Sequence, residues 1–191
     1  MVYAFILSLK KFVLFILAFC LLCLGVFVCV RKVERKIYPL NYKEQVWEYS
    51  IRFSVSCELI LATVKVESDF DKDAVSSKGA IGLMQITQNT ANYIALMLNE
   101  SDYDLTDPDV NLRFGTFYLK YLLERFESVE TAVCAYNAGE GNVSAWLKNK
   151  EYSADGVTLS SIPFKETRVY LEKIKKTFRK YKKLYGNILD K

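Results

Sequence analysis

Glu67 stands at the end of an apolar helical pattern, and its carboxyl group is the first candidate for chemistry in this chain. Ile60 and Val64 precede it at spacings of three to four residues, which places all three side chains on one helix face. A carboxyl group on an apolar face loses solvent, so its pKa rises and a proton stays available near neutral pH. Such a group can act as a general acid toward the bridging oxygen of a glycosidic bond. A helix-end glutamate paired with Lys65 or Lys72 is the more usual explanation of the spacing alone.

Two downstream segments carry amide and phenol groups that could surround such an acid. Gly82-Leu83-Met84-Gln85 offers a flexible turn, an apolar wall and one amide that can donate to a carbonyl or hydroxyl oxygen. Tyr136-Asn137-Ala138-Gly139 supplies a phenol and an amide beside a glycine that ends a helix. Each segment is weak alone, because glycine turns and helix C-caps are common. With Glu67 they predict a sugar-cleaving site built around a single proton donor.

The composition removes several other kinds of catalysis. The chain has 191 residues and no histidine, which excludes Ser-His-Asp and Cys-His nucleophiles and the commonest zinc ligand. Three of the five cysteines lie inside a hydrophobic segment, and Cys57 and Cys134 lie in predicted helices without metal-like spacing. We expect Cys57 and Cys134 to be buried, and a disulfide between them outside the cell remains open. Neither a metal nor a cofactor is expected.

Residues 12–30 form a run of nineteen residues without charge or proline. As a helix this run spans roughly 28 Å, close to the hydrocarbon thickness of a bilayer. Lysines flank its start, and four basic residues follow its end. A signal peptide usually ends in small residues before a cleavage site, whereas this run ends in Val28-Cys29-Val30. The sequence therefore favours an uncleaved transmembrane anchor over a signal peptide.

Apolar periodicity predicts that most of the remaining chain is helical. We expect an N-terminal flank at residues 1–11, a linker at 31–40, one domain at 41–184 and a tail at 185–191. Thr87 and Pro108 are expected at helix starts, and Gly139 at a helix end. Strand signals are confined to one small hairpin between residues 74 and 86. The predicted fold class is mostly α, with a small β element, after one transmembrane helix.

Five segments in this order resemble the soluble lytic transglycosylase (SLT) family, which is related to goose-type lysozyme. They are ES at residues 67–68, GAIGLMQ at 79–85, DPDVN at 107–111, AYNAGEGNV at 135–143 and IPFKETRVY at 162–170. The resemblance covers roughly residues 50–180. The family usually has proline where Glu140 stands and Met-Pro where Thr87-Gln88 stands, and neither departure touches the proposed proton donor.

The resemblance implies an α+β, lysozyme-like fold and cleavage of the β-1,4 bond between N-acetylmuramic acid and N-acetylglucosamine in peptidoglycan. Glu67 matches the catalytic acid. By the same resemblance Ser68 would buttress the site, and Met84 and Gln85 would line the sugar groove. Tyr136 and Asn137 would face the reacting sugar, Glu166 would hold a neighbouring subsite or order the groove, and Tyr170 would be a further substrate-binding residue. After donating its proton, Glu67 would accept one from the muramoyl C6 hydroxyl, and a 1,6-anhydro ring would form.

Two other functions stay open at this point. A lysozyme-type hydrolase needs a base that activates water, for which Asp69, Asp71 and Asp73 could be proposed, although a solvated acidic loop is their usual role. A non-catalytic wall-binding module would keep the groove without cutting. Glycan strands of peptidoglycan and the membrane are the expected partners, and nucleic acid is not.

The C-terminal segment has a strong positive charge. Residues 171–191 contain eight basic and two acidic residues, so they carry +6 although the whole chain carries +4. Anionic wall polymers or lipid headgroups are candidate partners, and a solvated helix face explains the charge equally well. The heavier basic flank after residue 30 would favour a cytoplasmic domain by the positive-inside rule. Cleavage of peptidoglycan instead requires the domain to lie outside the membrane.

Overall fold

Polar side chains cap the helix starts, as the sequence indicates. The computed structural model describes the backbone of residues 2–189 and the side chains of residues 11–12, 14–186 and 188–189. At four helix starts a side-chain oxygen accepts a hydrogen bond from a backbone N–H two or three residues later, which satisfies a donor that the helix leaves free. These capping residues are Ser56, Thr87, Asp107 and Ser128. The expected cap at Thr87, the helix start at Pro108 and the helix end at Gly139 are confirmed.

The described chain divides into two units, with the boundary after Pro39. The first unit is helix α1 (Val2–Ile37). Within α1, the 24 residues Leu14–Ile37 have a mean hydropathy of 2.7 and are long and apolar enough to cross a membrane. The helix continues through residues 31–37, where a linker was expected. It ends two residues before Pro39, because proline disfavours the helical conformation of the residue before it.

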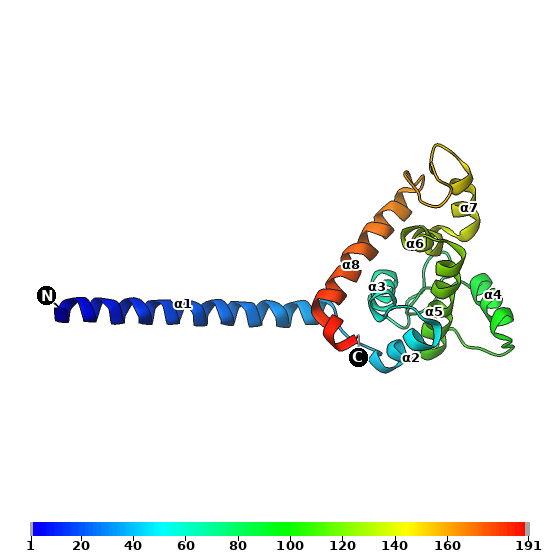
Figure 1. Ribbon diagram of the computed structural model, residues 1–191. Helices are drawn as coiled ribbons and strands as arrows, with labels where there is room; N and C mark the ends of the chain where they lie inside the picture. The colour runs from blue at the N-terminus through cyan, green and yellow to red at the C-terminus, as the bar shows by residue number, and fades with distance from the viewer. Residues whose placement is uncertain (1, 190–191) are drawn as a thin grey trace. The chain divides into compact units, whose positions relative to one another are not determined.

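The second unit contains the other helices of the described chain (Figure 1). They are α2 (Lys43–Phe53), α3 (Cys57–Glu67), α4 (Gln88–Leu98), α5 (Pro108–Arg125), α6 (Val129–Ala138), α7 (Glu140–Lys148) and α8 (Lys165–Leu189).

Helix α3 is the core of this unit. Its sequence is apolar on nearly every side, which is typical of a buried helix, and every residue from Cys57 to Val64 is buried. Helix α3 packs most extensively against α8 and also contacts α2, while α5 packs against α2, α4 and α6. In Figure 1, α3 lies between α8 on one side and α2 and α5 on the other. The end of α3, where Glu67 stands, is therefore held by its neighbours.

The segment between α3 and α4 provides the small β element. Val75 pairs with Ile81, and Ile81 pairs with Ile86, as two isolated antiparallel bridges. The expected hairpin is thus reduced to single bridges. The fold is mostly helical with a minor β component, as predicted.

Helix α8 continues to Leu189, into the stretch for which the sequence predicts a tail. Tyr185 and Leu189 are buried, although residues 185–191 were predicted to form a tail. They continue the three-to-four spacing of Tyr181 and Leu184, so the apolar face of α8 stays on the domain to its last described turn. Cys57 and Cys134 are buried, as expected, and no disulfide joins them.

Candidate active site

The carboxyl group of Glu67 is partly buried at the C-terminal end of α3. The phenol of Tyr170, from α8, donates a hydrogen bond of 2.7 Å to its Oε1 atom. Burial raises the pKa of Glu67 to about 7, the bond from Tyr170 opposes this rise, and the nearby charge of Glu166 adds to it. The predicted loss of solvent at Glu67 is confirmed. At neutral pH this carboxyl group exchanges a proton readily.

Glu67 faces a surface hollow of about 500 Å³ between the end of α3 and the first turns of α8. Four of the residues predicted for the site meet there, namely Glu67, Asn137, Glu166 and Tyr170. The hollow is completed by Val66, Lys165, Val169 and Lys173.

Asn137 presents its amide to this hollow in a fixed orientation. The hydroxyl of Thr167, which is buried, donates a hydrogen bond of 2.7 Å to Asn137 Oδ1. Because the oxygen is engaged, the amide nitrogen is the group that can donate to a substrate. Glu166 is different, since its carboxylate is exposed and lies 3.4 Å from Lys78 Nζ.

Tyr136, on α6, supports the loop beside the site. Its phenol donates a hydrogen bond of 2.8 Å to the carbonyl of Met84. Burial raises the pKa of Tyr136 well above its ordinary value, and the charge of Glu67 raises it further. The neutral phenol therefore links α6 to the loop after α3, within electrostatic reach of the acid.

Ser68, Met84 and Gln85 hold the loop rather than line the hollow. The Ser68 hydroxyl donates to the Leu83 carbonyl at 2.8 Å. The Gln85 amide donates to the carbonyls of Ala74 and Gly82 at 3.1 and 3.0 Å.

The Met84 side chain is fully buried, so the expectation that it lines a sugar groove is corrected. An added Cβ at Gly115 would lie 2.3 Å from Met84 Sδ, so the side chain packs directly on the α5 backbone. The polar groups of the loop turn inward because its backbone carbonyls need partners away from water.

Asn111, the last residue of the DPDVN segment, is a supporting residue whose role the sequence alone does not predict. Its side chain is fully buried, and its Oδ1 accepts the Met84 N–H at 2.8 Å. Its Nδ2 donates to the carbonyls of Ile81 and Leu105 at 2.9 and 3.0 Å. One side chain thus fixes both sides of the loop against α5. A polar residue on the apolar face of a predicted helix was the signal available in the sequence.

The three aspartates considered as alternative bases lie outside this hollow. Asp69 forms an ion pair with Lys65, Asp73 lies 2.8 Å from Lys72, and Asp71 accepts the N–H of Asp73 at 3.0 Å. They form a solvated acidic turn, which was their usual explanation. Among the residues that the structure describes, no three or more His, Cys, Asp or Glu side chains gather in a way that could hold a metal ion.

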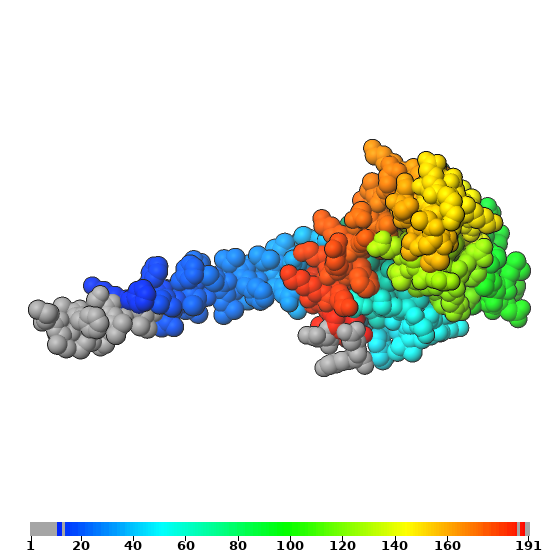
Figure 2. Space-filling view, turned by 45° about the horizontal axis from the view of Figure 1, so that its top comes forward, coloured from blue at the N-terminus to red at the C-terminus, as the bar shows by residue number. Residues whose placement is uncertain are grey.

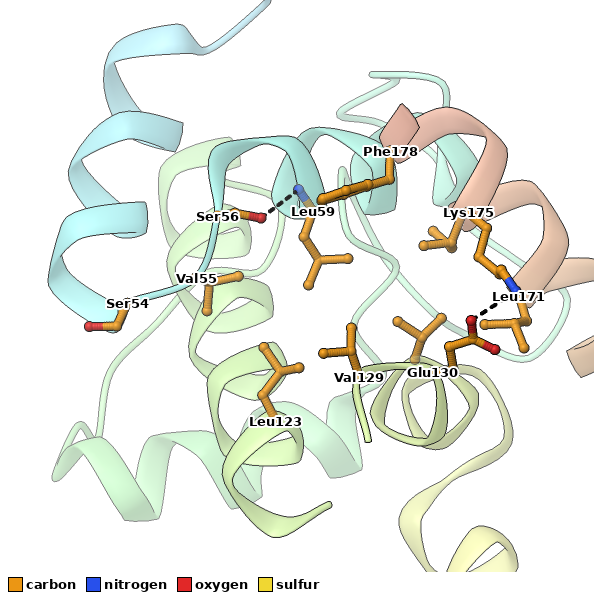
Figure 3. A pocket seen from close by; sticks show the side chains of 12 residues that line it. Ser54, Val55, Ser56, Leu59, Leu123, Val129, Glu130, Leu171, Lys175 and Phe178 are labelled. Atoms are coloured by element: carbon orange, nitrogen blue, oxygen red, sulfur yellow. Dashed lines mark hydrogen bonds and ion pairs between the residues drawn. The ribbon is translucent and has the colours of Figure 1, made fainter. Parts of the chain in front are cut away.

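A second hollow, of about 390 Å³, opens on another part of the domain (Figure 3). It is lined mainly by aliphatic side chains such as Leu59, Leu123 and Ile174. The one carboxyl group in its lining, that of Glu130, forms an ion pair with Lys175 Nζ at 2.8 Å. The hollow at Glu67 is therefore the better candidate active site.

The fold and the site define a helical, lysozyme-like domain with one partly buried glutamate facing a surface hollow. The family model of the transglycosylase SLT domain matches residues 45–157, and the chain belongs to this family.

Named relatives share the domain but are longer. The soluble lytic murein transglycosylase of Salmonella typhimurium is 36% identical over 143 residues, which cover 72% of this chain and 22% of the relative. The membrane-bound lytic murein transglycosylase C of Yersinia pestis is 31% identical over 178 residues, covering 78% of this chain and 48% of the relative. The chain thus spans about a fifth to a half of the length of these relatives.

A solved structure shows the same fold. The lytic transglycosylase Slt of Pseudomonas aeruginosa superimposes with a TM-score of 0.68 at 32% identity, over 77% of this chain and 25% of that one. That structure is of an inactive mutant in which a glutamate is replaced by glutamine.

Proposed function

We propose that this chain is a peptidoglycan lytic transglycosylase that cleaves the β-1,4 bond between N-acetylmuramic acid and N-acetylglucosamine. The observation that carries the proposal is the carboxyl group of Glu67, which faces the hollow, accepts a bond from Tyr170 and has a pKa raised to about 7. Family membership supports the same activity, because the relatives named above are lytic murein transglycosylases.

The raised pKa suits Glu67 to the first step. With a pKa of about 7, roughly half of the Glu67 carboxyl groups carry a proton at pH 7, against about 0.3% for an ordinary pKa near 4.5. Protonated Glu67 donates to the bridging oxygen as the C1–O bond of the muramoyl sugar breaks. Positive charge develops at C1, and the N-acetyl oxygen of the same sugar stabilises it. The amide nitrogen of Asn137 orients that N-acetyl group.

The second step uses the same carboxyl group as a base. Glu67, now a carboxylate, accepts the proton of the muramoyl C6 hydroxyl. The C6 oxygen attacks C1 and closes a 1,6-anhydro ring, so the proton lost in the first step is recovered. Glu166 and Tyr170 contact the sugars beside the reacting bond, while Ser68, Met84, Gln85 and Tyr136 hold the loop in place.

Hydrolysis by a lysozyme-type mechanism is the second candidate, because Glu166 places another carboxyl group on the same hollow. A pair of carboxyl groups is the usual arrangement in glycoside hydrolases, where one group activates water. Glu166 is exposed and lies 3.4 Å from Lys78 Nζ, which weakens it as a base. The transglycosylase reaction needs only Glu67, and we favour it for that reason.

The experiment is digestion of purified peptidoglycan by the full-length chain in detergent, followed by mass analysis of the products. We expect 1,6-anhydromuramoyl ends, and reducing muramic acid ends would assign the chain to hydrolysis instead. Glu67→Gln keeps the shape and removes the acid, so turnover should fall by about 10²-fold or more. Glu151→Gln, on an exposed loop, is the matched control. Binding of peptidoglycan by wild type without any product would indicate a non-catalytic wall-binding module.

We further propose that residues 12–30 anchor the chain in the membrane, with the domain on the outer side. The support is the apolar stretch in α1 and the location of peptidoglycan outside the membrane. Protease added to intact spheroplasts should digest the domain while a cytoplasmic marker survives. Protection of the domain until the membrane is broken would contradict this orientation.

A further inference from the structure

Helix α8 exposes a row of cations next to the hollow at Glu67. Lys173, Lys176 and Arg179 follow one another at intervals of three residues, so they occupy successive turns of one face. They line a shallow hollow of about 480 Å³ together with Arg168, Val169 and Glu172. We call Lys173, Lys176 and Arg179 the basic strip. Figure 2 shows α8, in orange to red, at the surface of the domain.

The basic strip is continuous with the candidate active site. Val169 and Lys173 line both the hollow that contains Glu67 and the shallow hollow of the strip. At about 1.5 Å per residue, Lys176 and Arg179 lie roughly 9 and 14 Å along α8 from Tyr170, which contacts Glu67. A polymer bound at Glu67 can therefore bring its neighbouring groups onto the strip.

The three cations of the strip present their charge to solvent, and Arg179 Nε also donates a hydrogen bond of 3.2 Å to the carbonyl of Lys175. All three are exposed, and none forms an ion pair with another residue that the structure describes. Glu172, the acidic residue that lines the same hollow, lies 3.8 Å from Lys175, which itself pairs more closely with Glu130 at 2.8 Å. The strip therefore has an excess of positive charge that selects carboxylate or phosphate groups.

We propose that the basic strip binds the carboxylates of the peptide branches of the polymer whose sugar lies at Glu67. This inference rests on the proposed function. Where a peptide branch is attached, the lactyl carboxyl group of the muramoyl sugar is an amide and carries no charge, whereas the peptide branch itself ends in carboxylates. Continuity with the hollow favours this occupant over a lipid surface, because a headgroup bound at the strip would compete with substrate at Lys173.

The test compares two substrates of equal chain length, glycan strands whose peptide branches keep their carboxylates and the same strands after those carboxylates have been converted to amides. The variant Lys176→Gln/Arg179→Gln neutralises the part of the strip that lies outside the Glu67 hollow. An exposed ion pair changes binding by about two- to fivefold, so this double variant should raise KM about fourfold or more at low salt, with kcat unchanged. The increase should appear only with strands whose peptides keep their carboxylates and should shrink at about 0.5 M salt.

A matched control removes the same charge elsewhere. Lys148 and Lys150 are exposed and lie outside α8, so changing both to glutamine alters the net charge equally. We expect this control to leave KM unchanged on both substrates. Equal effects of the strip variant on both substrates, or no effect on either, would overturn the proposal.

Two further measurements distinguish binding of peptide carboxylates from binding of lipid and from failure of the proposed function. KM is measured with the full-length chain in nanodiscs of phosphatidylcholine, with and without phosphatidylglycerol. An effect of the strip variant that appears only with phosphatidylglycerol would assign the strip to lipid and refute the proposal. If wild type cleaves neither substrate, the proposed function fails. The role of the strip can then still be tested by measuring the affinity of Glu67→Gln for the two kinds of strand. Equal binding of both strands would then refute it.

Discussion

The substitution Tyr170→Phe tests how the protonation of Glu67 is controlled. It removes the phenol that donates to Glu67 Oε1 at 2.7 Å and keeps the buried ring in place. A hydrogen bond to a charged group is worth about 1.5–3 kcal/mol, and about 1.4 kcal/mol corresponds to one pH unit. Because the bond stabilises the carboxylate, its loss favours the protonated acid. The pKa of Glu67, about 7 in wild type, should rise by about one to two pH units.

The assay is the pH dependence of kcat/KM on soluble glycan strands. Activity falls at high pH as the free enzyme loses the proton of its general acid. In Tyr170→Phe this falling limb should move to higher pH, so the variant loses less of its activity between pH 6 and 8 than wild type does. The ¹³C carboxyl resonance of Glu67, identified by its absence in Glu67→Gln, gives the same pKa without reference to turnover.

A second variant should move the falling limb of the pH profile of kcat/KM to lower pH. The charge of Glu166 raises the pKa of Glu67, so Glu166→Gln should lower it. The effect should be the smaller of the two, because Glu166 is exposed and solvent screens its charge. The reasoning is refuted if Tyr170→Phe leaves both the limb and the carboxyl titration unchanged, or moves them to lower pH.

Two further predictions concern stability, measured by chemical denaturation in detergent. The pKa of Glu67 is higher in the folded chain than in the unfolded chain, so the free energy of unfolding falls as pH rises from about 4.5 to about 7. Glu67→Gln should therefore have the same free energy of unfolding as wild type at pH 4. At pH 8 its free energy of unfolding should be higher than that of wild type by up to about 3 kcal/mol. An equal difference at both pH values would show that the carboxyl group is not desolvated. Gly82 has a φ of +75°, and an added Cβ would lie 2.4 Å from Asn111 Nδ2, so Gly82→Ala should cost about 3 kcal/mol or more and reduce activity. Gly79→Ala, at the same φ but with open space around the added atom, should cost only about 1 kcal/mol; equal costs would contradict the role given to Asn111.

Local signals predicted most of the helices, because caps and apolar periodicity act within one or two turns. Thr87, Pro108 and Gly139 stand where the expected helix boundaries lie. Helix α1 continues to Ile37 and α8 to Leu189, into stretches for which the sequence predicts a linker and a tail. The charged residues before Pro39 are compatible with a helix. The burial of Tyr185 and Leu189 depends on tertiary packing, which sequence spacing does not show.

The residue types of the site were predicted from local motifs, but the contacts between these residues were not. Glu67 and Tyr170 are 103 positions apart, yet helices α3 and α8 pack together and bring their side chains to 2.7 Å. The motif carrying Met84 and Gln85 gives the types of these residues but not the direction of their side chains. The structure turns both inward, where Met84 packs on Gly115 and the Gln85 amide satisfies loop carbonyls.

The sequence by itself determined that one carboxylic acid ends an apolar helix in a chain without histidine, and that family motifs accompany it. Residue types and helical spacing are local properties, so no three-dimensional structure was needed to read them. Tertiary structure alone decided how strongly Glu67 is desolvated, that Tyr170 donates to it and that Asn111 fixes the loop beside it. Each of these depends on distances between segments far apart in the chain, and packing around α3 sets those distances.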